Sequence, residues 1–322
     1  MEYGMPWPGA EVAAEAELRG ITAFCAGEFA HHEAYLTVSE MAAATTKARI
    51  GTAISYAFAR SPFLHASALR QLHRSAPGRV FVGLGSGTPR MNANWFGVDS
   101  SRPLGRMAEL VQALRAYLYA ENGERVRFAG EFYDIDARIA APVLGRLDIP
   151  VLLGAFNKGM VGVAGRHADG IVGHGLFTDR WWAEVVRPAL ARSDATEYGW
   201  VITAVNDADP ARASLDARRM VAFYLTVKTY DAYVAHHGWT EPVAAVRAAF
   251  ATGDTERMAA SVTDEMLDAV AVHGSTEQAR ELLRDRSALP RDVAFLSPPS
   301  FLVSERRQRA YARASLGLVG VR

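Results

Sequence analysis

The stretch VLLGAFNKGMVGVAGRHADG, residues Val151–Gly170, joins two kinds of pattern. It begins with a short apolar run typical of a buried strand and turns at Gly154. It then continues as a helical pattern that stops before a second apolar run. This order of strand, turn, helix and strand is typical of a parallel sheet with helices outside it. The turn itself could hold a dinucleotide, a single phosphate or no ligand.

The same alternation continues over most of the chain. The pattern predicts strands at Glu2–Gly4, Ile21–Cys25, Ile50–Ser55, Val80–Gly85, Pro150–Gly154, Gly170–Gly173, Trp200–Ala204 and Val293–Leu296. It predicts helices at Gly9–Arg19, Leu36–Thr46, Ala66–Ser75, Ser101–Ala120, Lys158–His167, Asp179–Ser193 and Thr276–Arg286. Eight strands separated by helices favour one α/β domain over residues 1–322, a TIM-like (β/α)8 barrel rather than an open sheet.

Two insertions interrupt this rhythm. Gly123–Leu147 contains VRFAGEFYDID, in which Gly130 and Glu131 separate two short β-like runs, so we expect a β-hairpin outside the barrel. Asp209–His273 follows the seventh strand and is mostly helical, with no strand pattern. This helical insertion could cover a substrate, because barrel enzymes place their active sites on that side, or it could be a helical pair that forms a dimer.

The composition excludes several classes of protein. Lys+Arg and Asp+Glu both number 35, so no basic excess points to nucleic acid or to an anionic membrane surface. No apolar run reaches the ~18 residues of a membrane span. Cys25 is the single cysteine, which rules out an internal disulfide and a cysteine-based metal cluster. The acidic, proline-interrupted start does not resemble a signal peptide, and we expect a cytoplasmic protein.

The glycine-rich turns do not form a dinucleotide fingerprint. Neither Gly83–Gly87 nor Gly154–Gly159 gives G-x-G-x-x-G in register, and both lie in mid-chain. Asn157-Lys158-Gly159 instead opens a helix, where free N–H groups and the helix dipole attract anions. Asn157 can cap this helix, Lys158 adds a positive charge, and Gly159 permits close approach of a ligand. A capped helix with an exposed lysine is the alternative.

The turn after the second strand, AGEFAHHEAY (Ala26–Tyr35), holds a dense set of polar residues. Glu28, His31, His32 and Glu33 lie within six residues. A carboxylate and an imidazole can exchange a proton near neutral pH. We expect no metal site, because adjacent histidines do not converge easily and no third ligand is evident. A solvated loop that caps a helix is the alternative interpretation.

An ordered set of stretches resembles the luciferase-like monooxygenase superfamily, in its branch of coenzyme F420-dependent oxidoreductases. The match extends over nearly the whole chain. The stretches are IGTAISYAFARSP (Ile50–Pro62), GRVFVGLGSGTPRMNANWFGVDSSRPLGRM (Gly78–Met107), GEFYDID (Gly130–Asp136), IPVLLGAFNKGMVGVAGRHADGIVGH (Ile149–His174), WWAEVVRPAL (Trp181–Leu190) and TDEMLDAVAVHGSTEQARELL (Thr263–Leu283).

The resemblance implies a barrel that binds a flavin or deazaflavin at the carboxyl ends of its strands. A non-proline cis peptide supports the ring system in similar proteins, and the matching residues here are Ala53-Ile54, followed by Ser55. Gly85 and Ser86 match a turn that faces the ribityl chain. The phosphate site matches the turn that contains Gly154, Ala155, Asn157, Lys158 and Gly159, with His174 nearby.

The resemblance also gives Glu28 and His31 candidate catalytic roles. Glu28 matches an acidic position beside the reactive edge of the cofactor. Phe29 stands where the sugar-phosphate dehydrogenase members carry their catalytic histidine, which argues against that activity. His31 could take over the role of that histidine.

The sequence therefore predicts an F420-dependent oxidoreductase. Such an enzyme transfers a hydride between C5 of the deazaflavin and a polarised C=C, C=N or C=O bond of a small molecule. An FMN-dependent monooxygenase of the same superfamily and an inactive flavin-binding relative are the alternatives. The resemblance also leads us to expect a homodimer, and no nucleic-acid or membrane partner.

Overall fold

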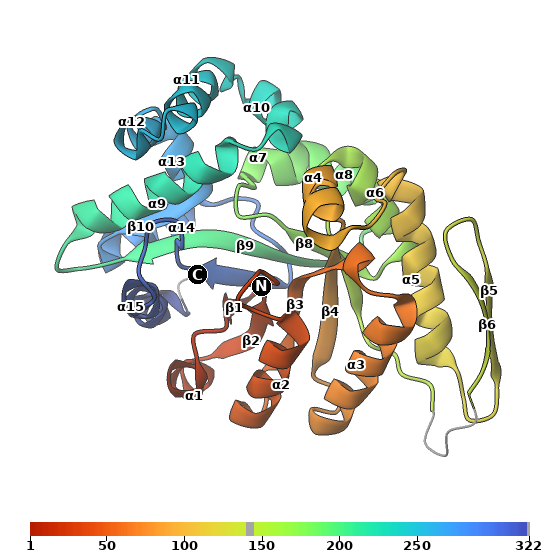
Figure 1. The fold of residues 1–322 in the computed structure, drawn as a ribbon. Helices are drawn as coiled ribbons and strands as arrows, with labels where there is room; N and C mark the ends of the chain where they lie inside the picture. The colour runs from red at the N-terminus through yellow and green to blue at the C-terminus, as the bar shows by residue number, and fades with distance from the viewer. Residues whose placement is uncertain (140–144, 321–322) are drawn as a thin grey trace.

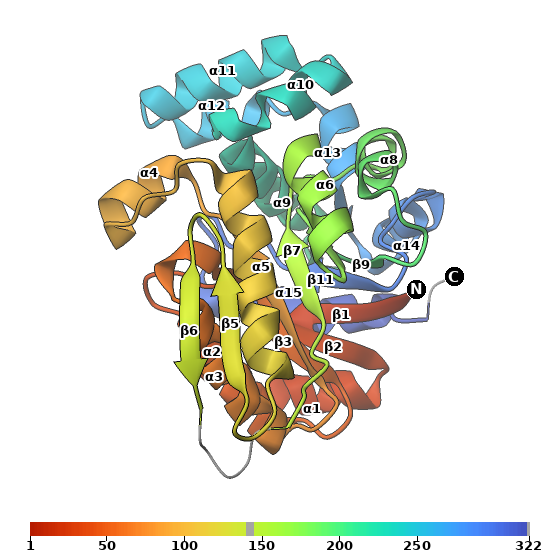
Figure 2. The same ribbon diagram turned by 90° about the vertical axis from the view of Figure 1, so that its right-hand side faces the viewer.

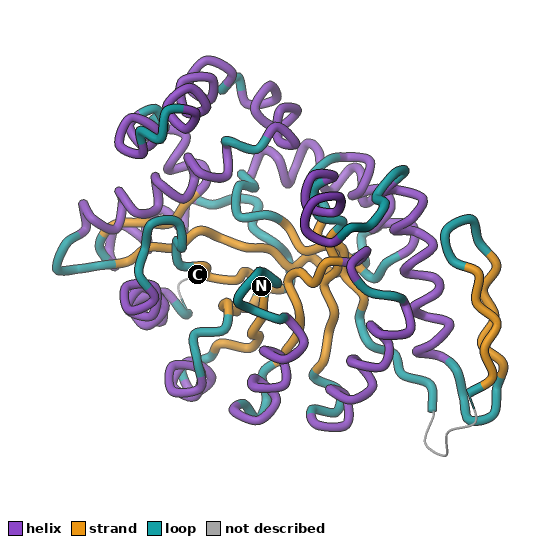
Figure 3. The backbone as a smooth tube through the Cα atoms, in the orientation of Figure 1, coloured by secondary structure: helices purple, strands orange, loops and turns teal. Residues whose placement is uncertain are grey.

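The structure, a computed structural model, describes residues 1–139 and 145–320 as a closed barrel of parallel strands surrounded by helices (Figure 1, Figure 3). Around the barrel the strands follow in chain order, and the last strand, β11, pairs with β1. The barrel strands are β1 (Glu2–Pro6), β2 (Ile21–Ala26), β3 (Arg49–Tyr56), β4 (Val80–Gly85), β7 (Val151–Gly154), β8 (Gly170–Gly173), β9 (Thr196–Val205) and β11 (Val293–Ser297). The predicted fold class is confirmed.

Helices cover the outside of this barrel and bury their apolar faces against it. They are α1 (Ala10–Leu18), α2 (Ala34–Ala44), α3 (Pro62–Ser75), α5 (Pro103–Tyr119), α6 (Lys158–His167), α7 (Asp179–Trp181), α8 (Arg187–Leu190), α14 (Thr276–Asp285) and α15 (Glu305–Ser315). Shorter segments are η1 (Ala57–Ala59), α4 (Pro89–Met91), η2 (Asn92–Phe96), η3 (Trp182–Val186) and η5 (Leu316–Leu318). Within the described residues, no helix is both long enough and apolar enough to pass through a membrane.

The interior of the barrel is filled by side chains. A cluster that includes Phe81, Tyr198 and Phe295 draws residues from seven of the eight strands, as expected for inward-facing positions. Two strand glycines make room for these rings. A Cβ atom at Gly4 would lie 2.6 Å from the Phe295 ring, and one at Gly51 would lie 2.6 Å from the Phe81 ring. The barrel is therefore a packed core that presents its loops at the carboxyl ends of the strands.

The seventh barrel strand begins earlier than the sequence pattern predicts. We predict a strand at Trp200–Ala204, but β9 begins at Thr196. The added residues include Glu197, whose fully buried carboxylate pairs with Arg187 at 3.0 Å and with Arg291 at 2.7 Å. Because the two partners come from other segments, 10 and 94 residues away along the chain, the strand pattern itself contains no sign that a charged residue belongs to a buried strand.

Both insertions are present, with one correction. The predicted hairpin consists of β5 (Arg125–Ala129) and β6 (Asp134–Arg138), which pair antiparallel beside α5 outside the barrel (Figure 2). Residues 140–144 of that predicted insertion lie outside the described residues. The helical insertion contains α9 (Pro210–Leu225), η4 (Lys228–Tyr230), α10 (Asp231–His237), α11 (Thr240–Ala251), α12 (Thr255–Ala260) and α13 (Asp264–Val270).

The expectation that this insertion contains no strand is wrong at its end. A short strand, β10 (Ala271–Gly274), pairs in parallel with the last residues of β9. Four residues are too few to produce a recognisable period of two, so the pairing with β9 decides the structure of this segment.

Helix α6 follows β7 and is held closely against α8. A Cβ atom at Gly165 would lie 2.1 Å from the backbone oxygen of Leu190. A Cβ atom at Gly162, in the same helix, would meet only the end of the Arg166 side chain, at 3.1 Å. Only the first of these positions therefore has a backbone neighbour that cannot move aside.

We expect Gly165→Ala and Gly162→Ala to change stability in opposite directions. Alanine is favoured over glycine by about 1 kcal/mol inside a helix. At position 165 the clash with a backbone carbonyl outweighs this gain, because overpacking costs about 1–3 kcal/mol. Urea denaturation should show a net loss of about 1–2 kcal/mol for Gly165→Ala and a gain of up to about 1 kcal/mol for Gly162→Ala. Equal stabilisation by both substitutions would contradict the close helix contact.

Candidate active site

A pocket of about 530 Å³ opens beside the loops that follow β2, β3 and β4. This volume is in the range of small-molecule sites, and barrel enzymes carry their chemistry at this end. The lining residues are Glu28, Phe29 and Ala30 after β2, Tyr56 at the end of β3, Ala59 and Arg60 beyond it, and Trp95 and Phe96 in η2. Of the predicted catalytic residues, Glu28 therefore lines the pocket.

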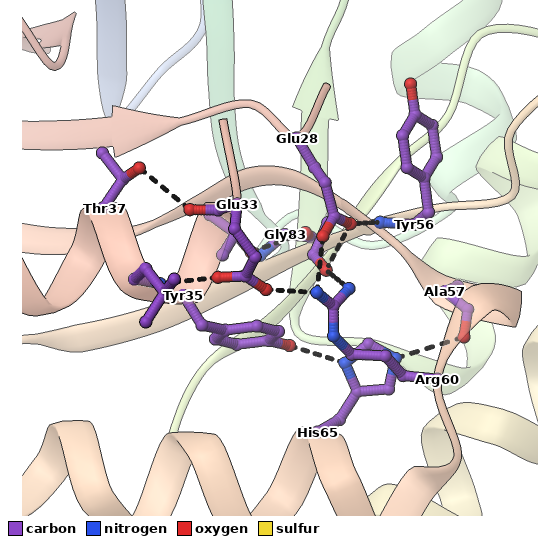
Figure 4. Close-up of polar contacts among 12 residues, drawn as sticks. Glu28, Glu33, Tyr35, Thr37, Tyr56, Ala57, Arg60, His65 and Gly83 are labelled. Atoms are coloured by element: carbon purple, nitrogen blue, oxygen red, sulfur yellow. Dashed lines mark hydrogen bonds and ion pairs between the residues drawn. The ribbon is translucent and has the colours of Figure 1, made fainter. Parts of the chain in front are cut away.

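Glu28 is held firmly by its neighbours (Figure 4). One carboxylate oxygen, Oε2, accepts hydrogen bonds from the Tyr56 backbone N–H at 2.7 Å and from the Ser55 hydroxyl at 3.1 Å. The other, Oε1, pairs with Arg60 at 2.6 Å. In addition, the Glu28 backbone N–H donates to the Ile54 carbonyl at 3.0 Å. These contacts join the turn after β2 to the end of β3 and fix the orientation of the carboxylate.

Arg60 serves two carboxylates rather than one. It also forms an ion pair with Glu33, whose other carboxylate oxygen accepts the Leu36 N–H and caps helix α2. The guanidinium carbon lies 5.3 Å from the centre of the Tyr35 ring. Burial acts to lower the pKa of Arg60, but the hydrogen bond and charge of Glu28 outweigh it, and the pKa is raised. The positive charge of Arg60 is therefore already paired with the carboxylates of Glu28 and Glu33.

A buried tyrosine–histidine pair lies beside this cluster (Figure 4). The Tyr35 hydroxyl is 2.6 Å from His65 Nδ1, and His65 Nε2 is 3.1 Å from the Ala57 carbonyl. Because a carbonyl only accepts, Nε2 must donate, and neutral His65 accepts the Tyr35 O–H at Nδ1. Burial lowers the pKa of His65 to about 4. The neutral imidazole thus anchors α3 and α2 to the turn that carries Arg60.

His31 lies apart from the Glu28 carboxylate. Its side chain is exposed, its ring packs edge-on against Phe29 at 5.9 Å, and it lies 4.0 Å from the ring of His32. Glu28 instead faces Ser55, Tyr56 and Arg60. In residues 1–139 and 145–320, no three His, Cys, Asp or Glu side chains are grouped to hold a metal ion.

The end of β3 contains the irregularity expected from the resemblance. The Ala53-Ile54 peptide bond is cis, and the register with β4 shifts between Ala53 and Ser55. The Ile54 side chain occupies space that side chains at two neighbouring strand ends would need. A Cβ atom at Gly85 would lie 2.7 Å from it, and one at Gly154 would lie 2.6 Å from it. The structure thus brings the predicted residues of β3, β4 and β7 together around Ile54.

The turn after β4 is held by a residue that sequence reasoning missed. The buried Asn92 amide donates to the Ser86 carbonyl at 2.8 Å and to the Thr88 carbonyl at 3.0 Å. Gly87 has a φ of 65°, a conformation that favours glycine. Asn92 also begins η2, a π-helical segment of the kind often found at functional sites. This segment brings Trp95 and Phe96 to the pocket.

The turn after β7 corrects one expectation. Asn157 occupies the N-cap position of α6, but its side chain makes no capping hydrogen bond. Its amide donates instead to the Thr229 carbonyl at 3.0 Å, and its Oδ1 atom is buried without a partner among the described residues. The expectation that Asn157 caps α6 is therefore wrong, because contact with the helical insertion takes its side chain away. Lys158 and Gly159 are exposed at the start of the helix.

His174 follows β8 and is surrounded by aromatic rings. The rings of Phe156, Tyr224 and Tyr230 lie 5.3, 4.5 and 5.1 Å from its own. His174 Nδ1 accepts the Leu176 N–H at 3.1 Å, and its Nε2 lies 3.2 Å from the Tyr230 hydroxyl. Burial lowers its pKa to about 3. Neutral His174 therefore carries its proton on Nε2 and adds no positive charge at neutral pH.

The helical insertion packs over the loops that follow β7 and β8. Tyr230 stacks on Phe156 with ring centres 4.1 Å apart. On the next helix, His237 Nε2 lies 2.7 Å from the Thr178 hydroxyl, next to the start of α7. Together with the contact between Asn157 and Thr229, these interactions place η4 and α10 above the carboxyl ends of two barrel strands.

Comparison with known proteins identifies the family. The model of the luciferase-like monooxygenase family matches residues 8–292, which is most of the chain. The chain belongs to this family. An uncharacterized protein of Mycobacterium tuberculosis is 32% identical to it over 272 residues, which is 80% of each chain.

Two further matches are to tetrahydromethanopterin reductases. The 5,10-methylenetetrahydromethanopterin reductase of Archaeoglobus fulgidus is 26% identical over 266 residues, or 79% of this chain and 77% of the relative. The coenzyme F420 dependent tetrahydromethanopterin reductase of Methanopyrus kandleri superposes with a TM-score of 0.79 at 19% identity, covering 99% and 98% of the two chains. The latter likeness establishes the fold. A putative coenzyme F420-dependent oxidoreductase of Mycobacterium tuberculosis is 26% identical over 303 residues, which is 86% of each chain. This chain is thus related to F420-dependent oxidoreductases.

The buried imidazole of His65 predicts a loss of stability in mild acid. The unfolded chain binds a proton below a pH of about 6.5, whereas folded His65 resists protonation down to a pH of about 4. The folded protein should therefore lose on the order of 3 kcal/mol of its free energy of unfolding as the pH falls from about 6.5 to about 4. In urea denaturation from pH 7.5 to 4, His65→Gln should lose less stability than the parent. The same substitution at exposed His31 is the control, and equal slopes for parent and His65→Gln would refute this role.

Proposed function

We propose that this protein is an F420-dependent oxidoreductase that transfers a hydride between C5 of the deazaflavin and a polarised C=C, C=N or C=O bond of a small molecule. Its relationship to F420-dependent oxidoreductases supports this proposal. The observation that carries it is the start of α6, where an uncapped helix end and the exposed Lys158 follow β7. The cytoplasmic location and the homodimer remain predictions from the sequence.

The residues at this helix end suit a phosphate group. The first N–H groups of a helix have no partner inside the helix, and no side chain among the described residues caps α6. Lys158 adds a compact positive charge, and Gly159 is exposed next to it. Asn157 Oδ1 only accepts hydrogen bonds, and the side-chain amide donates to the Thr229 carbonyl, so Asn157 would contribute its backbone N–H rather than its side chain. We propose that Asn157, Lys158 and Gly159 hold the cofactor phosphate.

The remaining predicted contacts surround Ile54. We propose that Ala53, Ile54 and Ser55 support the ring system of F420, and that Gly85 and Ser86 face the chain between the ring and the phosphate. Gly154 and Ala155 belong to the phosphate turn. His174 lies nearby as a neutral group, so its role is to position Tyr230 and the insertion rather than to supply charge.

The reaction needs a group that handles a proton. When bound, F420 supplies a hydride to the substrate or accepts one from it. Glu28 presents a carboxylate whose orientation is fixed by Tyr56 and Arg60, and His31 presents an imidazole on the same turn. We propose that one of them holds or moves the accompanying proton.

Binding of the two candidate cofactors provides the direct test. The purified protein should bind F420 more tightly than FMN in equilibrium dialysis. It should also oxidise reduced F420 with a panel of compounds that includes cyclohex-2-enone, which has polarised C=C and C=O bonds. Tight retention of FMN together with oxygen uptake would favour a monooxygenase instead. Binding of either cofactor without turnover of any panel compound would favour an inactive relative.

Lys158→Ala should weaken F420 binding about 10- to 100-fold, the range expected for loss of one contact to a charged group. Lys47→Ala is the matched control, because Lys47 is an exposed lysine in the turn that precedes β3, at the opposite end of the barrel. The Lys47→Ala variant should bind F420 with the same affinity as the parent. Dissociation constants from fluorescence titration decide the point, and equal effects of the two substitutions would remove α6 as the phosphate site.

Glu28→Gln and His31→Gln separate the two candidates for proton transfer. The substitution that removes the acting group should lower turnover about 10²- to 10⁴-fold while leaving F420 affinity within about twofold. Single-turnover oxidation of reduced F420 is the measurement, with the pH dependence of the rate as a second readout. If both variants react at the parent rate, neither residue is catalytic.

A further inference from the structure

The pocket at β2, β3 and β4 has aromatic walls that are open to solvent. Phe29 is 52% exposed and Trp95 is 55% exposed, and their rings meet edge-on at 5.6 Å. Tyr56 and Phe96 form a second pair with ring centres 4.9 Å apart. Half of the residues that line the pocket are therefore aromatic. Large exposed aromatic surfaces grouped around one hollow are typical of a ligand site.

The positive charge at this pocket is already paired with carboxylates. Its lining includes Glu28 and Arg60, which form an ion pair at 2.6 Å. Arg60 also pairs with Glu33, and Glu28 also accepts two hydrogen bonds. An anionic ligand would therefore find no free positive charge here. It would lose hydration without gaining a charged partner.

One polar group of the lining remains available. The Tyr56 side chain extends away from the ion pair, with its hydroxyl at the far end (Figure 4). This hydroxyl has no hydrogen-bond partner within residues 1–139 and 145–320. Burial, together with the negative charge of Glu28, raises the pKa of Tyr56, so its hydroxyl stays protonated at neutral pH. It is thus an O–H donor in an aromatic pocket.

From these features we infer that the pocket takes an uncharged aromatic carbonyl compound as its substrate. The rings of Phe29, Trp95 and Phe96 pack against the aromatic part of the substrate, and the Tyr56 hydroxyl donates a hydrogen bond to the carbonyl oxygen. This inference rests on the proposed function for the reaction that follows binding. It also accounts for Phe29, an apolar residue on the turn where sugar-phosphate dehydrogenases have a histidine.

Binding of matched probes tests the charge requirement. 2-Acetylnaphthalene is a neutral bicyclic ketone, and 2-naphthoate has the same ring system with a carboxylate. In isothermal titration calorimetry the ketone should bind at least about tenfold more tightly than the carboxylate, because the carboxylate loses hydration at a site without a free cation. Equal or tighter binding of 2-naphthoate would overturn the inference.

Substitutions test the aromatic walls and the hydroxyl separately. Phe29→Ala and Trp95→Ala should each weaken binding of 2-acetylnaphthalene about tenfold, because each removes a large apolar contact. Phe250→Ala is the control, since Phe250 is 48% exposed on α11 and does not line the pocket. Tyr56→Phe should weaken the ketone about two- to tenfold but leave 2-ethylnaphthalene, which lacks the carbonyl, unchanged. Unchanged ketone affinity in the Phe29, Trp95 and Tyr56 variants would refute these assignments.

The same titrations with F420 present distinguish this inference from the proposed function. Ketone binding should persist when F420 is bound. If F420 and the ketone compete, and Trp95→Ala weakens both equally, the pocket belongs to the cofactor and the inference is wrong. If the protein binds the ketone with the expected variant effects but does not bind F420, the proposed function fails while the assignment of the pocket stands.

Discussion

The ion pair between Glu28 and Arg60 determines how the candidate active site is assembled. Two segments that are separate in the sequence meet through it, one after β2 and the other after β3. Both side chains are largely withdrawn from water, with 11% and 21% of their surfaces exposed. Such a pair is stable only when further hydrogen bonds offset the loss of hydration. The Tyr56 N–H and the Ser55 hydroxyl provide these bonds, so the polypeptide on both sides of the pocket is fixed by the same interaction.

A second constraint acts through shape rather than charge. The Ile54 side chain fits because the adjacent strands end in Gly85 and Gly154, which have no Cβ atoms to occupy its space. The Ile54 carbonyl in turn accepts the backbone N–H of Glu28. One residue at the end of β3 thus contacts the ends of two other barrel strands and the turn after β2. Gly85 and Gly154, which the resemblance assigns to the cofactor site, are required in the first place by this contact.

The sequence predicted the parts of the fold that depend on local pattern. Helix α6 has the predicted bounds, and each predicted barrel strand is present, because apolar runs and amphipathic helices carry their own periodicity. The start of β9 and all of β10 escaped this reasoning. In β9 a buried Glu197 depends on arginines from two other segments, and in β10 four residues are too short to show a period.

The same division applies to the candidate active site. The residues of the turn after β7 and the cis peptide were predicted, the latter from resemblance to a family. The partners of their side chains were not predicted. Arg60 lies 27 residues from Glu33 and the Asn157 amide binds a carbonyl 72 residues away, so no local spacing indicates either contact. Long-range polar contacts of this kind depend on how helices and loops finally pack, which single-sequence patterns do not specify.

The two ends of this site differ in their electrostatic character, and that difference limits what can bind there. The start of α6 presents an uncapped helix end and the exposed charge of Lys158. The pocket near Glu28 presents aromatic rings and a neutralised ion pair. Ile54 lies between them, since it contacts Gly154 at one side and Glu28 at the other. A ligand that extends from α6 over Ile54 would therefore need an anionic end, and a second ligand in the aromatic pocket would need no charge. This requirement follows from the positions of the start of α6, the end of β3 and the turn after β2, and it does not depend on the identity of the substrate.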